Sequence, residues 1–216
     1  MGVKAAVALE AGKERIFQKW GVKEVVTTAL MSVLAILLMF LGAMLTLFNT
    51  RFSMVASGGL GMFLAAPVFM LMVLRVNRCG IMTVFTTLAS LVFCTMGNYI
   101  YMIPFYIAGG LIIDLIFFKS ERQRQNVWWI TGAWSLFSGL YLLSTLVPFI
   151  FDIQSYIDDV VANRGVGQDY IDAFFYFYTD PIWIAGIAAA TVVLGFLGCL
   201  VGKMLMRKHF ARAGAL

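Results

Sequence analysis

The residues that could take part in chemistry are polar and aromatic side chains near the ends of apolar segments, and their types suit the binding of a small molecule. Amide, hydroxyl and carboxylate groups can orient a ligand, and flat rings can stack against it. The candidate binding residues are Asn49, Arg51, Asn98, Tyr99, Tyr101, Tyr141, Ser144, Asp180 and Trp183. The alternative interpretation is an ordinary belt of interfacial residues at a membrane boundary.

The sequence lacks the patterns that are typical of a catalytic centre. No GxSxG, HExxH or P-loop pattern occurs in it. A membrane hydrolase would need an activated nucleophile or a metal ion. The single histidine, His209, and the scattered cysteines Cys79, Cys94 and Cys199 make no set of metal ligands. We therefore expect a protein that is not an enzyme, carries no cofactor or metal, and cannot use ATP by itself.

The composition predicts an integral membrane protein. Hydrophobic residues make up 62% of the 216 residues, charged residues make up only 12%, and the mean hydropathy is +0.90. Soluble domains are about 45–50% apolar and about 25% charged. The net charge of +5 could indicate nucleic-acid binding, but the basic residues lie in short tails and loops beside apolar segments. Orientation in a membrane explains these positions, so we expect membrane lipid, and no nucleic acid, as a partner.

The elements that must position the candidate residues are apolar segments of about the length of a membrane-spanning helix. They cover residues 25–48, 53–74, 80–96, 97–118, 127–151 and 182–205. We therefore predict an all-α membrane protein with a six-helix transmembrane bundle over residues 25–205. A cytoplasmic tail or interfacial helix at 1–24 precedes the bundle, and a basic cytoplasmic tail at 206–216 follows it.

The distribution of charge predicts which end of the bundle faces outward. If both termini are cytoplasmic, every lysine and arginine except Arg51 and Arg164 falls on the inner side, which matches the positive-inside rule. The long connection at 152–180 then lies outside the cell. This connection carries most of the aspartates and has the pattern of two short amphipathic helices. The candidate binding residues fall at the same, outer end.

One stripe of the first apolar segment is a candidate docking face for another protein. Thr28, Ser32 and Ala35 recur at helical spacing, and small residues let helices approach closely in lipid. The alternative is that this stripe packs against other helices of the same chain.

The carboxyl group of Asp114 lies inside the apolar segment 97–118. An acid in such a segment is costly in lipid and should face protein or water. In a structural interpretation it is protonated, or it pairs with Arg75, Arg78 or Arg122 near the inner surface. In a functional interpretation it takes part in coupling or in contact with a partner.

The middle third of the chain resembles a known group of transporter subunits. The likeness rests on Gly58-Gly59-Leu60-Gly61 and the residues up to Leu74, on Arg78-Cys79-Gly80-Ile81, on Gly97-Asn98-Tyr99, and on the run from Gly109 to Ile116. In these residues, in its predicted spans and in its lack of an ATPase motif, the chain is similar to the S components of energy-coupling factor (ECF) transporters. It most resembles the Trep-Strep family of predicted S components.

The resemblance implies a small bundle in the prokaryotic plasma membrane that captures a micronutrient, such as a vitamin-like or flat-ring molecule, outside the cell. It also implies docking on a T component that is driven by two ATPase subunits. The family's pocket corresponds to residues 49–53, 98–101, 141–144 and 180–183. Many S components dock through an Ala-xxx-Ala pair, for which this chain has Thr28-xxx-Ser32 with Ala35 one turn further on.

Two other functions are compatible with the sequence. One is a self-contained small transporter or channel, although no internal repeat of spans or charge pair near the midplane is visible. The other is a structural membrane subunit that has no small ligand.

Overall fold

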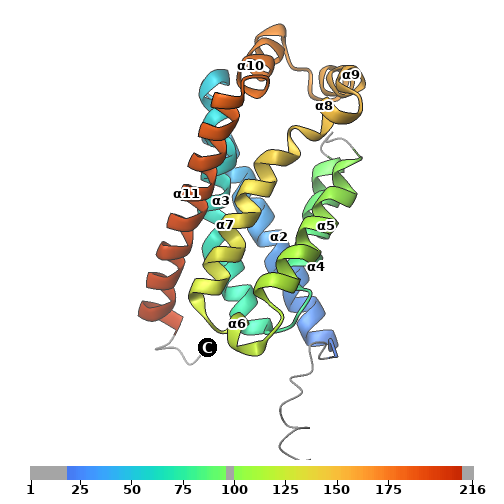
Figure 1. The fold of residues 1–216 in the computed structure, drawn as a ribbon. Coiled ribbons are helices and arrows are strands. Elements are labelled where there is room, and N and C mark those ends of the chain that lie inside the picture. Colours follow the sequence, from blue (N-terminus) through green and yellow to red (C-terminus); the bar gives the residue numbers. More distant parts are fainter. Residues whose placement is uncertain (1–18, 96–99, 211–216) are drawn as a thin grey trace, which may run out of the picture.

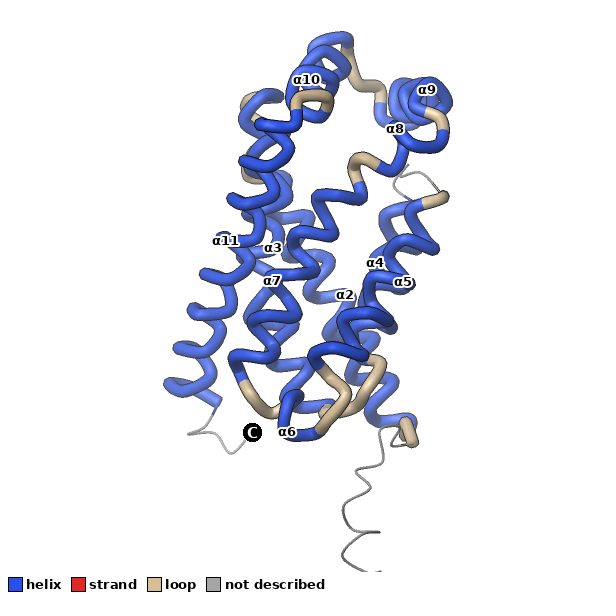
Figure 2. Tube along the Cα trace, viewed as in Figure 1, coloured by secondary structure: helices blue, strands red, loops and turns tan. Residues whose placement is uncertain are grey.

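The computed structural model describes residues 19–95 and 100–210, and every regular element in these ranges is a helix (Figure 2). The longer helices run roughly along one axis and form a bundle (Figure 1). They are α2 (Val22–Met44), α3 (Thr50–Val76), α4 (Ile81–Thr95), α5 (Met102–Phe117), α7 (Val127–Ser144) and α11 (Pro181–Leu205). The shorter elements are α6 (Glu121–Arg124), α8 (Val147–Phe151), α9 (Ile153–Arg164), α10 (Gln168–Tyr178) and the π-helical turn η1 (Met206–Phe210).

Three of the described helices are long and apolar enough to cross a membrane. They are Val22–Met44, Thr50–Val76 and Pro181–Lys208, and the helices Ile81–Thr95 and Met102–Phe117 are apolar but shorter. Large apolar side chains are exposed along the bundle, as with Leu30, Leu37 and Val193. Exposed apolar surface of this extent is typical of contact with lipid or with another protein. The prediction of an all-helical membrane protein is therefore confirmed.

Two predicted segments differ from the observed helices. The segment predicted at 127–151 is split, because α7 ends at Ser144 and α8 begins at Val147. Pro148 lies in the first turn of α8, and its ring would collide with the carbonyl group of Ser144 in a continuous helix. Of the segment predicted at 97–118, residues 97–99 lie outside the described part of the chain, and the helix α5 covers Met102–Phe117. Of the predicted N-terminal tail, residues 1–18 lie outside the described part of the chain.

The two ends of the bundle carry different elements. Helices α9 and α10, which we call the cap, lie at one end, and α6 lies at the opposite end (Figure 1). Asp152 begins α9 by accepting hydrogen bonds from the amide and the hydroxyl group of Ser155, at 3.1 and 2.7 Å. These two bonds hold the pKa of Asp152 below its usual value. Gly165 ends α9 with a φ of 60°, as the Arg164-Gly165 pair predicts.

An aromatic cluster fills the half of the bundle toward α6. Trp134 is fully buried, stacks on Phe69 with ring centroids 4.5 Å apart, and lies 5.7 Å from Phe85. Its indole nitrogen donates a hydrogen bond to the carbonyl group of Met62 at 3.0 Å. Phe118 adds a further ring to the same cluster. This half of the bundle is therefore densely packed with rings.

Glycines set the distance between α3 and its two main neighbours, α2 and α11. A Cβ atom on Gly42 of α2 would lie 2.5 Å from the backbone nitrogen of Gly61 on α3. A Cβ atom on Gly198 of α11 would collide with the carbonyl oxygen of Phe63. The backbones can approach this closely only because these positions have no side chain.

Polar contacts join the helix ends at the α6 end. Arg124 is 2% exposed and donates hydrogen bonds to the carbonyl group of Phe118 and to the side chain of Asn77. Asn77 ends α3 in the left-handed conformation, with a φ of 47°. Arg78 pairs with Glu24 at 3.1 Å and so links the α3–α4 turn to α2. The guanidinium group of Arg124 lies at the C-terminal end of α5, where a positive charge near the carbonyl groups is favourable.

Gly42→Ala is expected to destabilise the protein, because the added methyl group would push α2 away from α3. Overpacking of this kind costs about 1–3 kcal/mol, and about 2–4 °C of melting temperature is lost per kcal/mol in a chain of this size. Gly186→Ala is the matched control, since nothing lies within 4 Å of a Cβ atom there. Thermal unfolding in detergent, followed by circular dichroism, measures both variants. Equal melting temperatures would contradict the observed packing of α2 on α3.

Candidate ligand-binding site

A cavity of about 360 Å³ lies between the cap and the bundle helices. Helices α2, α3, α4, α5 and α7 form its sides, and residues of the cap cover it. The lining residues are Met39, Phe40, Ala43, Ser53, Met54, Ser57, Phe93, Met102, Tyr106, Tyr141, Ser144, Thr145, Tyr156, Tyr170, Phe174 and Tyr178. Sites for small molecules are concave, mostly apolar and typically about 300–1,000 Å³ in volume. The cavity therefore has the size and the composition of a small-molecule site.

A buried hydrogen-bonded pair, Tyr106 and Ser144, lies on the cavity wall. The hydroxyl group of Ser144 donates to the carbonyl group of Tyr141 at 2.6 Å, which uses its only proton. The phenol of Tyr106 must therefore be the donor in its 2.9 Å bond to Ser144. The Tyr106 ring packs between Phe93 and Phe137, whose ring centroids lie 6.0 and 6.2 Å away. These contacts fix both hydroxyl groups, and they join the cavity to the aromatic cluster below it.

The cap covers the cavity with one face of α10. Tyr170, Phe174 and Tyr178 recur every four residues, so they share this face. The phenol of Tyr178 donates a hydrogen bond to the carbonyl group of Met54 on α3, at 2.9 Å. Burial, and then the neighbouring tyrosines, raise the pKa of Tyr178, so the phenol keeps its proton at neutral pH. The bond therefore persists across the physiological pH range and fastens α10 to α3.

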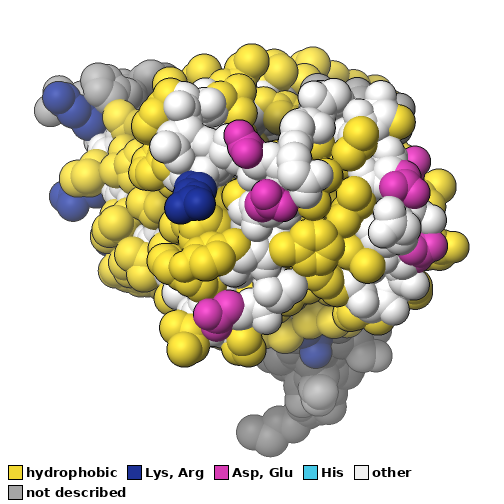
Figure 3. Space-filling view, turned by 90° about the horizontal axis from the view of Figure 1, so that it is seen from above, with side chains coloured by type: hydrophobic (Ala, Val, Ile, Leu, Met, Phe, Trp, Pro, Cys, Tyr) yellow, Lys and Arg dark blue, Asp and Glu magenta, His cyan; other side chains and the backbone are white. Residues whose placement is uncertain are grey.

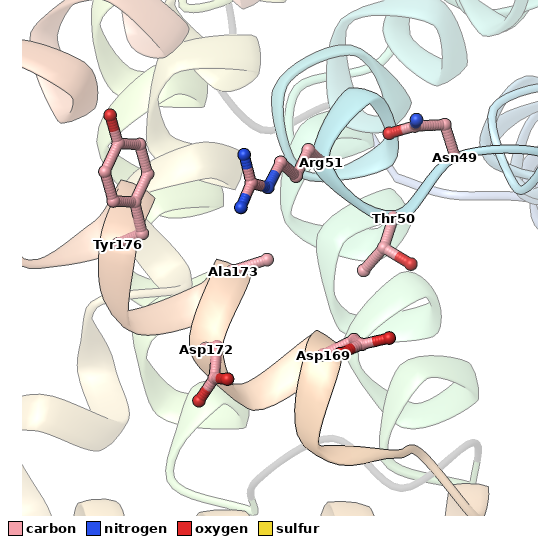
Figure 4. A pocket seen from close by; sticks show the side chains of 7 residues that line it. All are labelled: Asn49, Thr50, Arg51, Asp169, Asp172, Ala173 and Tyr176. Carbon is pink, nitrogen blue, oxygen red and sulfur yellow. The ribbon is translucent and has the colours of Figure 1, made fainter.

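A second hollow, which we call the groove, lies between the beginning of α3 and α10 and has a volume of about 500 Å³. Arg51 extends from α3 toward α10, which carries Asp169, Asp172 and Tyr176 (Figure 4). The groove is thus polar and contains both signs of charge. The charge and exposure of its residues distinguish it from the cavity.

Four of the predicted binding residues line one of these hollows. They are Tyr141 and Ser144 in the cavity, and Asn49 and Arg51 in the groove. Asn98 and Tyr99 lie outside the described residues. The structure thus divides these four candidates between two different hollows at the cap end of the bundle.

Tyr101, Asp180 and Trp183 lie at the same end but are not among the lining residues of either hollow. Tyr101 stacks on Phe151 with ring centroids 4.9 Å apart. Asp180 caps α11 by accepting a hydrogen bond from a first-turn amide at 2.8 Å. Trp183 packs against Phe177, with centroids 4.9 Å apart. Each of these side chains makes a local contact and lines neither hollow, so their assignment to the binding site stays a prediction.

Several lining residues were not predicted from the sequence. Tyr170, Phe174 and Tyr178 could have been found, because their spacing places three rings on one helical face. Tyr106 and Tyr156 give no such signal. They reach the cavity only because α5 and α9 pack against other helices in three dimensions.

The predicted docking stripe on α2 is not at the surface. Thr28, Ser32 and Ala35 are each 0% exposed, and the hydroxyl group of Ser32 contacts the sulfur of Met72 on α3 at 3.6 Å. The stripe packs within the chain, as the alternative interpretation held. The expectation that these three residues offer a docking face is therefore wrong for this conformation.

Asp114 has a structural partner that the sequence did not indicate. It is 2% exposed and accepts hydrogen bonds from the amide of Met82 at 3.1 Å and from the amide and hydroxyl group of Thr83 at 2.7 and 2.6 Å. It thereby caps the beginning of α4, and Arg78, one of its predicted partners, pairs with Glu24 instead. This burial leaves no surface for contact with a partner protein, so the docking role predicted for Asp114 is corrected.

The described residues form a helical membrane protein with an aromatic cavity beneath the cap at one end. A family model described as a hypothetical bacterial integral membrane protein (Trep_Strep) matches residues 22–212. The match includes every described helix, and the chain belongs to this family. No curated protein and no solved structure matches the chain.

Tyr178→Phe is expected to loosen the cap without changing the ring that covers the cavity. The lost hydrogen bond is worth about 1 kcal/mol, so amide hydrogen exchange in α10 should accelerate by up to about fivefold. Tyr176→Phe is the matched control on the same helix, because Tyr176 is 60% exposed. If exchange in α10 is equally slow in both variants, the bond to Met54 does not hold the cap.

Asp114→Ala is expected to destabilise the protein by about 2–3 kcal/mol, because it removes the acceptor of three hydrogen bonds at the start of α4. Asp180→Ala removes a more exposed cap and should cost about 1 kcal/mol. Chemical unfolding in detergent compares the two variants. An Asp114→Ala protein with unchanged stability that no longer copurifies with other subunits would instead support a role in partner contact.

Proposed function

We propose that this protein is the substrate-capture S component of an ECF-type ABC importer, and that the cavity is its substrate site. The observation that carries the proposal is a partly open cavity that lies beneath the cap and is closed by packed rings toward the α6 end. Phe69, Phe85 and Trp134 fill the space between it and the α6 end. A channel needs a continuous path, whereas a capture subunit needs a site that opens toward one side only.

We infer that α2, α3, α4, α5, α7 and α11 all cross the membrane. The shorter helices support this because their exposed side chains are apolar, such as Leu91 on α4, Ile112 on α5 and Leu143 on α7. At about 1.5 Å per residue, α4 and α5 are shorter than a bilayer core of about 30 Å. Neighbouring turns and local thinning of the bilayer compensate for such a mismatch at modest cost.

We infer that the cap end faces outward in a bacterial plasma membrane. All the described lysines and arginines except Arg51 and Arg164 belong to segments at the α6 end, which the positive-inside rule assigns to the cytoplasm. Trp128 lies under the ammonium group of Lys203 at that end, at 4.5 Å, as is typical of residues at a membrane boundary. The cavity then faces the side from which a nutrient arrives.

Capture in this proposal has two parts. A micronutrient enters the cavity from outside, and the aromatic face of α10 covers it. Release toward the cytoplasm requires energy, and the sequence has no nucleotide-binding motif to provide it. A T component with two ATPase subunits would supply that energy. Since Thr28, Ser32 and Ala35 are buried, docking on α2 would use its exposed residues, such as Val33 and Leu37.

Purification of the tagged chain from its native membranes tests the proposal. Native mass spectrometry should detect a retained small molecule, together with a T component and two ATPases. Reconstitution of the chain alone into liposomes is the complementary measurement. Substrate flux through the chain alone, with no ATPase bound in native membranes, would show a self-contained transporter instead.

Ala43→Phe is expected to abolish retention of the small molecule, because the added ring would occupy part of the cavity. Met44→Phe is the matched control, since Met44 is the next residue on α2, is 65% exposed and is not among the lining residues. Native mass spectrometry of both variants, with thermal unfolding to verify the fold, measures the effect. Retention by the Ala43→Phe protein at the wild-type level would place the substrate elsewhere.

A further inference from the structure

We propose that the cavity selects an organic ammonium cation, a quaternary or protonated amine whose charge lies beside apolar groups. This inference rests on the proposed function and specifies the chemical class of its substrate. It follows from the electrostatic character of the lining, from the direction of the hydroxyl protons, and from the charge of the cap.

The described lining residues of the cavity carry no group that would neutralise an anion. Among the described lining residues there is no lysine, arginine or histidine. A carboxylate or phosphate that enters would lose its hydration and gain no counter-ion, which is strongly unfavourable. Arg51 lies in the groove rather than in the cavity. The described lining has no aspartate or glutamate either, so it disfavours acids and would hold a cation through ring faces and lone pairs alone.

Several lining hydroxyl groups already use their protons in hydrogen bonds within the chain. Tyr106 donates to Ser144, Thr145 donates to the carbonyl group of Leu142 at 2.6 Å, and Tyr178 donates to that of Met54. An oxygen atom whose proton is engaged offers only lone pairs. These groups suit a ligand that brings positive charge or hydrogen-bond donors.

Aromatic rings make up a large part of the lining. The faces of aromatic rings are negative and attract cations, most strongly where water is excluded. Phe93 and Tyr106 of the bundle and Tyr170 and Phe174 of the cap contribute rings to the lining. A small inorganic cation would need about six oxygen ligands in a fixed geometry. A weakly hydrated organic cation needs only ring faces and scattered acceptors.

A further observation concerns the surface above the cavity. Acidic side chains are spread over this face of the molecule (Figure 3). Those on α9 and α10 are Asp158, Asp159, Asp169 and Asp172. The positive-inside rule accounts for the scarcity of lysine and arginine outside but does not require aspartates there. A negative surface around a site raises the local concentration of cations and speeds their entry.

Three probes of nearly the same shape test the proposal on the full chain in lipid nanodiscs. They are choline, which is cationic, 3,3-dimethyl-1-butanol, which is its neutral counterpart, and 3,3-dimethylbutanoate, which is anionic. Isothermal titration calorimetry should give an affinity for choline at least about tenfold higher than for the alcohol, and no binding of the anion. Equal or tighter binding of the alcohol or of the anion would overturn the proposal.

Matched variants of α10 locate the binding and separate it from an effect on folding. Tyr170→Leu removes a ring from the cavity, and it should weaken choline several-fold while leaving the alcohol unchanged. Tyr176→Leu removes a ring that lines the groove, and it should change neither affinity. An equal loss for choline and the alcohol in Tyr170→Leu would mean that the ring acts through structure and would count against selection by charge.

The small molecule retained in native membranes decides the case in which none of the three probes binds. If mass spectrometry then identifies a retained molecule without an ammonium group, the inference fails while the proposed function stands. A retained organic ammonium compound supports both. If no small molecule is retained under any condition, the proposed function itself fails.

Discussion

The contact between Trp134 and α3 is the interaction on which the shape of this bundle most depends. The indole of Trp134 is fully buried, so its nitrogen must find an acceptor inside the protein. It donates to the carbonyl group of Met62, while its rings stack on Phe69. This combination fixes α7 against α3 at a level below the cavity. The rings around it fill the α6 half of the bundle, and the empty volume is left near the cap.

The close approach of the other helices follows from the same central position of α3. Gly42 and Gly61 bring α2 against one side of α3, and Gly198 brings α11 against another. In lipid, helices gain little from the hydrophobic effect when they associate, so tight packing and a few hydrogen bonds supply the stability. Asp114 is one of these polar contacts, since it ties α5 to the first turn of α4. Close backbone packing and buried hydrogen bonds thus hold the bundle together below the cap.

Polar side chains inside the bundle illustrate why a polar residue in an apolar segment is weak evidence for a site. Thr131, Ser138 and Thr191 are buried and donate to carbonyl groups four residues earlier in their own helices. Ser144 makes the same type of local bond, yet it also lines the cavity. Its sequence context does not distinguish it from the others. What distinguishes it is Tyr106, which comes from a different helix.

The sequence by itself determined the features that depend on composition and on local chemistry. The apolar segments required a helical membrane protein, because unpaired backbone groups are too costly in lipid. Asp180 begins α11 and Gly165 ends α9, and caps of this kind can be recognised in a sequence because capping involves neighbouring residues only. Tertiary structure alone decided that Thr28, Ser32 and Ala35 face inward, that Asp114 caps α4, and that Tyr106 and Tyr156 meet at one cavity. Helical periodicity shows that residues share a face, but which face meets which neighbour depends on the fit of side chains from distant parts of the chain.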